Sequence, residues 1–98
     1  MTVGVLRITM IVPGSRSLKE KRHALRSLKE RIRHRFNVSI AEVEAEDLWQ
    51  RAVLGVAHVA NDADHVRSVL DEVANHCRNA PDAEFVDAEM ELTNTEGE

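Results

Sequence analysis

The chain has 98 residues, of which 43% are hydrophobic and 31% are charged, so it can form one modest globular core without disulfides or a metal. A single cysteine excludes an internal disulfide and is typical of a reducing compartment, and no apolar run approaches the roughly 20 residues of a membrane-spanning helix. We therefore expect one cytoplasmic domain over residues 1–92, no membrane partner, and a disordered polar tail over residues 93–98.

The first two elements are a strand and a long amphipathic helix. Residues 3–12 are rich in β-branched side chains and end at Pro13, which predicts a strand followed by a tight turn. Ser17 has the position of a helix N-cap, and Glu20 three residues later completes a capping box. The apolar residues of this helix gather on one side; they are Leu18, Ala24, Leu25, Leu28, Ile32 and Phe36.

The rest of the chain predicts two strands, a second helix and a last strand. Residues 38–43 and 51–60 are short apolar segments joined by an acidic connection, which is the pattern of an antiparallel hairpin. Residues 61–64 read Asn-Asp-Ala-Asp, a helix-start signal, and the helix that follows ends before Pro81. Residues 84–92 form the last strand, in which apolar and acidic side chains alternate.

This order of elements predicts an α+β fold, the ferredoxin-like βαββαβ sandwich, in which a four-stranded antiparallel sheet carries two helices on one face. The opposite face of the sheet is then open to solvent or to a partner. The predicted core consists of Leu6, Ile8, Met10, Leu25, Leu28, Ile32, Ile40, Leu54, Val56, Val66, Val69, Leu70, Val73, Val86 and Met90.

The first helix carries a row of cations. Between residues 16 and 35 the chain has nine Lys or Arg residues and two acids, whereas after Phe36 it has fifteen acids and three basic residues. A solvated helix face normally mixes both signs, and cations near a helix N-terminus oppose the helix dipole. The sequence therefore predicts an anionic partner for this helix, with a solvated charged face as the alternative. The row consists of Lys19, Arg22, Arg26, Lys29 and Arg33.

The turn before this helix is a second candidate for anion binding. It leads from a strand into a helix N-terminus, where free backbone N–H groups can hold a phosphate. Arg16, Ser17 and Lys21 therefore join the predicted anion- or RNA-binding residues, with a simple turn and helix cap as the alternative. The longer glycine- and arginine-bearing loop of acylphosphatases is absent, so this turn does not predict an enzyme.

Three blocks of sequence form a recognisable set: PGSRSLKEKR at residues 13–22, RFNVS at residues 35–39 and DLWQRA at residues 47–52. In this order and spacing they resemble the YlxP-like family of small bacterial proteins, a family of unknown function. The resemblance implies a ferredoxin-like fold. It also implies an association with RNA or ribosomes, since the family's genes often neighbour those for translation initiation and ribosome maturation. It implies no catalytic residues.

The remaining polar and reactive residues show no catalytic or metal-binding arrangement. The five histidines lack metal-ligand spacing, and Cys77 lies on the apolar stripe of the second helix, as a core residue does. Asp87, Glu89 and Glu91 share one face of the last strand, where solvation or ion pairs with Arg7 would explain them. We therefore predict no metal and no cofactor.

These observations predict a non-enzymatic protein that binds the phosphate backbone of RNA or a ribosomal particle through its first helix. Trp49 and Arg51 are further candidates for partner contact, with anchoring of the acidic loop as the simpler role for Trp49. The open sheet face lacks the aromatic side chains of an RRM, so RNA would have to use the helix.

The alternative function is a self-associating structural or regulatory module, a homo-oligomer that pairs two sheets through their open faces. The outward apolar residues that would contribute are Val5, Ile11, Val53 and Val59.

Overall fold

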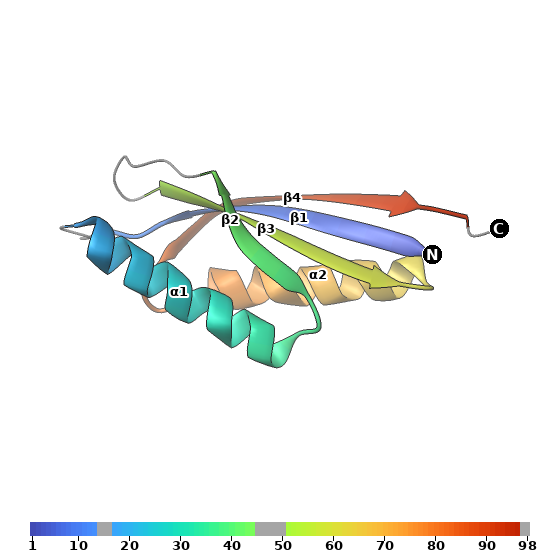
Figure 1. Cartoon of the computed structure of the whole chain (residues 1–98), viewed down its shortest axis with the longest axis horizontal. Helices are drawn as coiled ribbons and strands as arrows, with labels where there is room; N and C mark the ends of the chain where they lie inside the picture. Colours follow the sequence, from blue (N-terminus) through green and yellow to red (C-terminus); the bar gives the residue numbers. More distant parts are fainter. Residues whose placement is uncertain (14–16, 45–50, 97–98) are drawn as a thin grey trace.

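The computed structural model of the protein describes residues 1–13, 17–44 and 51–96. In these residues the strands form one antiparallel sheet in the order β2-β3-β1-β4, and two helices lie on the same face of it (Figure 1). The predicted ferredoxin-like α+β fold is therefore confirmed. The elements are β1 (Thr2–Ile11), α1 (Leu18–Arg35), β2 (Ser39–Glu44), β3 (Arg51–Ala60), α2 (Ala63–Arg78) and β4 (Glu84–Asn94).

β1 lies in the middle of the sheet and connects its two halves. It pairs with β3 on one side, where Ile8 lies opposite Leu54, and with β4 on the other, where Leu6 lies opposite Met90. Because successive side chains of a strand point to opposite faces, Leu6, Ile8 and Met10 all face the helices, and all three are buried. The central strand thus contributes three large apolar side chains to the core, and its other two core-facing residues are Thr2 and Gly4.

Both helices begin at the predicted residues. Ser17 has the extended backbone of an N-cap (φ −156°, ψ 161°), and its Oγ accepts the backbone N–H of Glu20 at 3.2 Å. Asp62 caps α2 in a similar way, since its carboxylate accepts the N–H of Asp64 at 3.3 Å. Neither of the described helices is long and apolar enough to cross a membrane.

Most of the predicted core is buried between the sheet and the helices. Val69 is only half-buried, because it lies at the edge of the α2 stripe, and Ala74 occupies a buried position instead. Met90 is also half-buried, but it packs against the core. The predicted residues that are fully enclosed are Leu6, Ile8, Met10, Leu25, Leu28, Ile32, Ile40, Leu54, Val56, Val66, Leu70 and Val73.

The prediction that Val86 belongs to the core is wrong, because its side chain is 51% exposed. The pairing between β4 and β1 is irregular at this point: Asp87 lies opposite Thr9, but Phe85 lies opposite Met10, so Val86 has no partner in β1. Such an extra residue, a β-bulge, shifts the alternation of side chains by one position. Phe85 therefore packs against the core where strict alternation would have placed its neighbour.

β4 also extends beyond the predicted boundary of the domain. The strand ends at Asn94, and the N–H of Thr95 then donates to the carbonyl oxygen of Met1 at 2.8 Å. The amino group of Met1 donates in return to the carbonyl oxygen of Thr95 at 3.0 Å. The prediction of a disordered tail is therefore wrong for residues 93–95, because backbone pairing needs no apolar side chains. Residues 97–98 lie outside the described part of the chain.

Candidate nucleic-acid interface

α1 packs on the sheet through one apolar side and lies beside the edge strand β2 (Figure 1). Leu25, Leu28 and Ile32 form the buried side of the helix. The guanidinium of Arg33 donates a hydrogen bond to the carbonyl oxygen of Ile40, in β2, at 2.8 Å. Residues three and four positions apart share a helix face, so this contact places the whole row of cations on the β2 flank of α1.

The row is accessible, and four of its five cations form no ion pair in the part of the chain that the structure describes. No ion pair within the described residues involves Lys19, Arg22, Arg26 or Lys29. Like charges three or four positions apart on a helix repel each other by a few tenths of a kcal/mol per pair, about 0.2–0.5. A polyanion bound along the helix would remove this repulsion. The exposed members of the row are Lys19, Arg22, Arg26 and Arg33, and Lys29 is half-buried.

The start of α1 differs from the predicted anion site. Lys21 is only 3% exposed, because it lies four residues before Leu25 and so shares the buried side of the helix. Lys21 therefore does not belong to the accessible surface, contrary to the prediction. The Oγ of Ser17 accepts a hydrogen bond from the N–H of Glu20, so Ser17 caps the helix, which is the alternative to anion binding given above. Arg16 lies outside the described residues.

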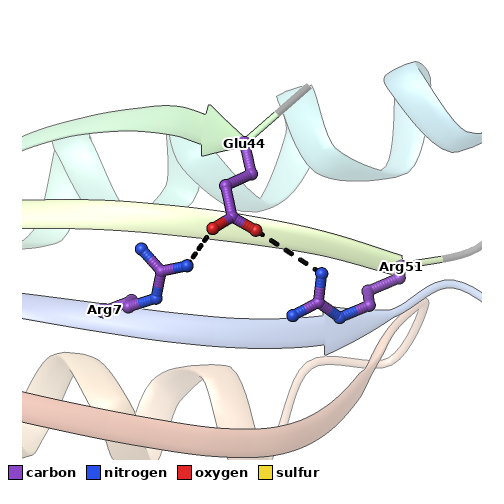
Figure 2. A network of polar contacts seen from close by, with 3 residues as sticks. All are labelled: Arg7, Glu44 and Arg51. Carbon is purple, nitrogen blue, oxygen red and sulfur yellow. Dashed lines mark hydrogen bonds and ion pairs between the residues drawn. The ribbon is translucent and has the colours of Figure 1, made fainter. Parts of the chain in front are cut away.

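On the open face of the sheet, Glu44 joins two arginines (Figure 2). Its carboxylate forms an ion pair with Arg7 of β1 and another with Arg51 of β3, whose Nη1 lies 3.5 Å from Oε2 of Glu44. Arg7 lies opposite Gly55 in β3, and the carboxylate of Glu44 reaches Arg7 from β2, across β3. Ion pairs between Arg7 and the acids of β4 are therefore the wrong explanation for those acids. Trp49 lies outside the described residues.

The Glu44 network predicts a pH-dependent contribution to stability. The hydrogen bond from Arg7, assisted by the charges of Arg7 and Arg51, lowers the pKa of the Glu44 carboxyl below its ordinary value of 4.5. A carboxyl whose pKa is lowered by folding stabilises the fold above its unfolded pKa and loses this effect as pH falls through the folded pKa. Urea unfolding should therefore show that Glu44→Gln is less stable than the parent at pH 7, with the difference shrinking below pH 4.5. A difference that stays constant down to pH 3 would contradict this assignment.

A second group of basic side chains lies on the opposite flank of α1, where the spacing of the row did not reveal it. Partial burial, together with the positive charges of Arg31 and Arg35, lowers the pKa of His76 in α2. The rings of Phe36 and His76 lie nearly perpendicular to each other, with their centroids 6.2 Å apart, and the guanidinium of Arg35 lies 5.8 Å from the centroid of the Phe36 ring. α1 contains more Lys and Arg residues than the row uses, and this excess was the sequence signal that a second side of the helix is basic. α1 is thus basic on both sides of its buried stripe.

The reactive side chains lie inside the fold. Cys77 is buried in the core, and burial raises the pKa of its thiol to about 11, so it is a poor nucleophile. His58 is also buried, with Nδ1 at 2.7 Å from the carbonyl oxygen of Asn37 and Nε2 without a partner among the described residues. The ring of His65 lies 5.7 Å from that of His58. The described part of the chain holds no group of three side chains that could bind a metal ion together.

Comparison with solved structures shows the fold. The chain is similar to the de novo designed protein Foldit4, with a TM-score of 0.56, 12% sequence identity, and coverage of 98% of this chain and 100% of that one. It is also similar to the crystal structure of the putative chlorite dismutase TA0507, with a TM-score of 0.51, 11% identity, and coverage of 94% of this chain and 44% of that one. At these identities the likeness concerns the arrangement of strands and helices alone.

Comparison of sequences shows the family. The model of the family described as "Protein of unknown function (DUF503)" matches residues 3–90. The chain is 33% identical over 82 residues to the "Uncharacterized protein YlxP" of Bacillus subtilis (strain 168), a match that covers 84% of this chain and 89% of that protein. The resemblance found in the three sequence blocks is thereby confirmed, and the chain belongs to the YlxP-like DUF503 family.

Proposed function

We propose that the protein is a non-enzymatic RNA-binding protein that holds the phosphate backbone of RNA, free or within a ribosomal particle, along the β2 flank of α1. The observation that carries this proposal is the accessible row of cations without ion pairs in the described residues. From Lys19 to Arg33 the row extends over roughly 21 Å at the rise of an α-helix, which is long enough to meet several phosphates of one strand.

The charge distribution elsewhere supports the same surface. On the open face of the sheet, β4 presents Asp87, Glu89 and Glu91, all exposed, and their charge repels phosphate. The described residues of that face include no aromatic side chain on which a base could stack. These charges disfavour the binding of RNA to the β4 side of the open face and support α1 as the proposed binding surface.

The test is to remove charge from the row without disturbing the helix. The triple substitution of Arg22, Arg26 and Lys29 by Gln keeps good helix formers at two exposed positions and one half-buried position, so the fold should survive. Each lost phosphate contact reduces the slope of log K against log salt by about 0.7 for a single strand, so the slope should become shallower by about 2. Fluorescence anisotropy of a labelled single-stranded RNA at several KCl concentrations measures the slope. Sedimentation with ribosomal particles measures the association itself.

A matched pair of single variants controls for the loss of one charge. Arg22 and Arg67 are both exposed arginines on helices, but only Arg22 lies in the row. Arg22→Gln should weaken binding, whereas Arg67→Gln should not. If the folded triple variant binds RNA and ribosomal particles as tightly as the parent, with an unchanged salt slope, the row is a solvated helix face and the proposed function is wrong.

A further inference from the structure

The open face of the sheet has an exposed valine on each of three strands, beside the ion pairs that Glu44 forms with Arg7 and Arg51. Both helices lie on the other side of the sheet, and nothing in the described residues covers this face (Figure 1). Three of its valines are strongly exposed: Val5 by 44%, Val43 by 52% and Val59 by 54%. Val53 points to the same face but is fully buried, beside the ion pair of Glu44 and Arg51, so it does not belong to the exposed patch that the sequence predicts.

The face contains a hollow of about 560 Å³. The half formed by β2 and β3 is lined by four small residues, Ser39, Ala41, Gly55 and Ala57, and by Val43. Larger residues line the other half, namely Val5 and Arg7 on β1 and Glu89 and Glu91 on β4. A methyl group added at Gly55 would lie 2.6 Å from Cγ1 of Val43, so a larger residue there would crowd this wall of the hollow.

Each small residue on one half of the hollow lies in the same line across the strands as a larger residue on the other half. Ala41, Gly55, Arg7 and Glu89 lie in one line across the four strands, and Ser39, Ala57, Val5 and Glu91 lie in the next such line. A two-fold axis parallel to the strands would exchange β3 with β1 and β2 with β4. Gly55 would then face the partner's Arg7, and Ala57 would face the partner's Val5.

We propose that the open face is a docking surface for a second copy of this chain, related to the first by a two-fold axis parallel to the strands. The sizes of the residues that would face each other and the negative charge of β4 both favour this axis over the other axis in the plane of the interface. The alternative in-plane axis, perpendicular to the strands, would lay β4 on the partner's β4 and oppose Asp87, Glu89 and Glu91 to their own copies. The parallel axis lays the acidic strand on β2 instead, where Glu89 and Glu91 meet the uncharged Ala41 and Ser39. Glu44 would face the partner's Asp87, but the charge of Glu44 is already paired with Arg7 and Arg51.

The face is large enough for a specific dimer. The axis lays the 6-residue β2 on the partner's β4, so the strands overlap over roughly 510 Å² in each copy at about 3.3 Å per residue and about 4.8 Å between strands. Two copies therefore bury roughly 1,000 Å², which reaches the ~1,000 Å² expected of a specific interface. The surface of α1 that the proposed function uses lies on the opposite layer and stays free, so the two proposals can fail separately.

The mass in solution gives the first test. The parent should have twice the chain mass of 11.0 kDa by size-exclusion chromatography with light scattering. Val5→Lys and Val59→Lys each place a charge in the apolar face and should reduce the mass to that of one chain while circular dichroism stays unchanged. Ser68→Lys, at an exposed position of α2, adds the same charge outside the face and should remain a dimer. A monomeric parent, or folded variants with the parent's mass, would overturn the proposal.

Cross-linking tests the axis and does not depend on the lysine variants being folded. Ala41→Cys and Glu89→Cys each add one exposed thiol, whereas the native Cys77 is buried and unreactive. With a short bis-maleimide, a cross-linked dimer should form in a mixture of the two variants and in neither variant alone, because Ala41 faces the partner's Glu89. Cross-linking of Glu89→Cys with itself would show β4 on β4 and overturn the arrangement, as would the absence of any cross-link in the mixture.

Discussion

Leu28→Asp should unfold most of the domain at room temperature. Leu28 is fully buried on the side of α1 that faces the sheet. Truncating a buried leucine to alanine already costs about 2–5 kcal/mol, and an unpaired carboxylate in an apolar environment adds several more. The total is comparable to the roughly 5–15 kcal/mol that stabilises a domain of this kind. Far-UV circular dichroism during urea titration should show no cooperative transition, or one with its midpoint close to zero denaturant.

An exposed position on the same helix provides the control for Leu28→Asp. His23 is exposed, so His23→Asp introduces the same side chain without burying it, and its effect should stay within about 0.5 kcal/mol. If Leu28→Asp melts at the parent's temperature, Leu28 is not in the core, and α1 faces the sheet with a different side from the one described above.

Gly4→Val should produce the second large loss of stability, because α2 lies directly on the backbone of β1 at this residue. A Cβ atom at Gly4 would lie 2.4 Å from Cγ1 of Val66 and 2.7 Å from Cδ1 of Leu70, both of which are buried and cannot move aside freely. Forcing extra carbons into a packed core costs about 1–3 kcal/mol and occasionally more. We expect the upper end of that range, about 3 kcal/mol, measured as the free energy of unfolding in urea.

A double-mutant cycle separates this clash from a general effect of valine in the strand. In a Val66→Ala background the nearest clashing atom is gone, so Gly4→Val should cost clearly less than it does in the parent. Equal costs in both backgrounds would mean that the contact between β1 and α2 is not what excludes a side chain at residue 4.

The features that the sequence predicted correctly are those with local causes. The capping of α1 depends on Ser17 and Glu20, which are three residues apart, and the burial of Leu6, Ile8 and Met10 follows from simple alternation along one strand. Such patterns need no knowledge of what lies opposite. The order and type of all six elements could therefore be predicted from the chain alone.

The features that were missed depend on partners distant in sequence. The bulge at Val86 appears only when β4 is aligned with β1, and the ion pair of Glu44 with Arg7 spans three strands. The burial of Lys21 was missed for another reason. Its charge indicated an exposed position, whereas its place four residues before Leu25 puts it on the buried side of the helix. Within the candidate site, the row beside β2 was predicted by spacing, but the approach of Arg31 to α2 required the packed helices.

The position of β1 in the sheet has a consequence for synthesis of the chain. β1 is made first, but one of its two neighbours, β4, is made last: Val3 pairs with Val59 on one side and with Thr93 on the other. A ribosome delivers the chain from its N-terminus at about 5–20 residues per second. Throughout the synthesis of the intervening segment, one edge of β1 has unpaired N–H and C=O groups, which are a template for non-native strand pairing. The sheet can become complete only when almost the whole domain has left the ribosome.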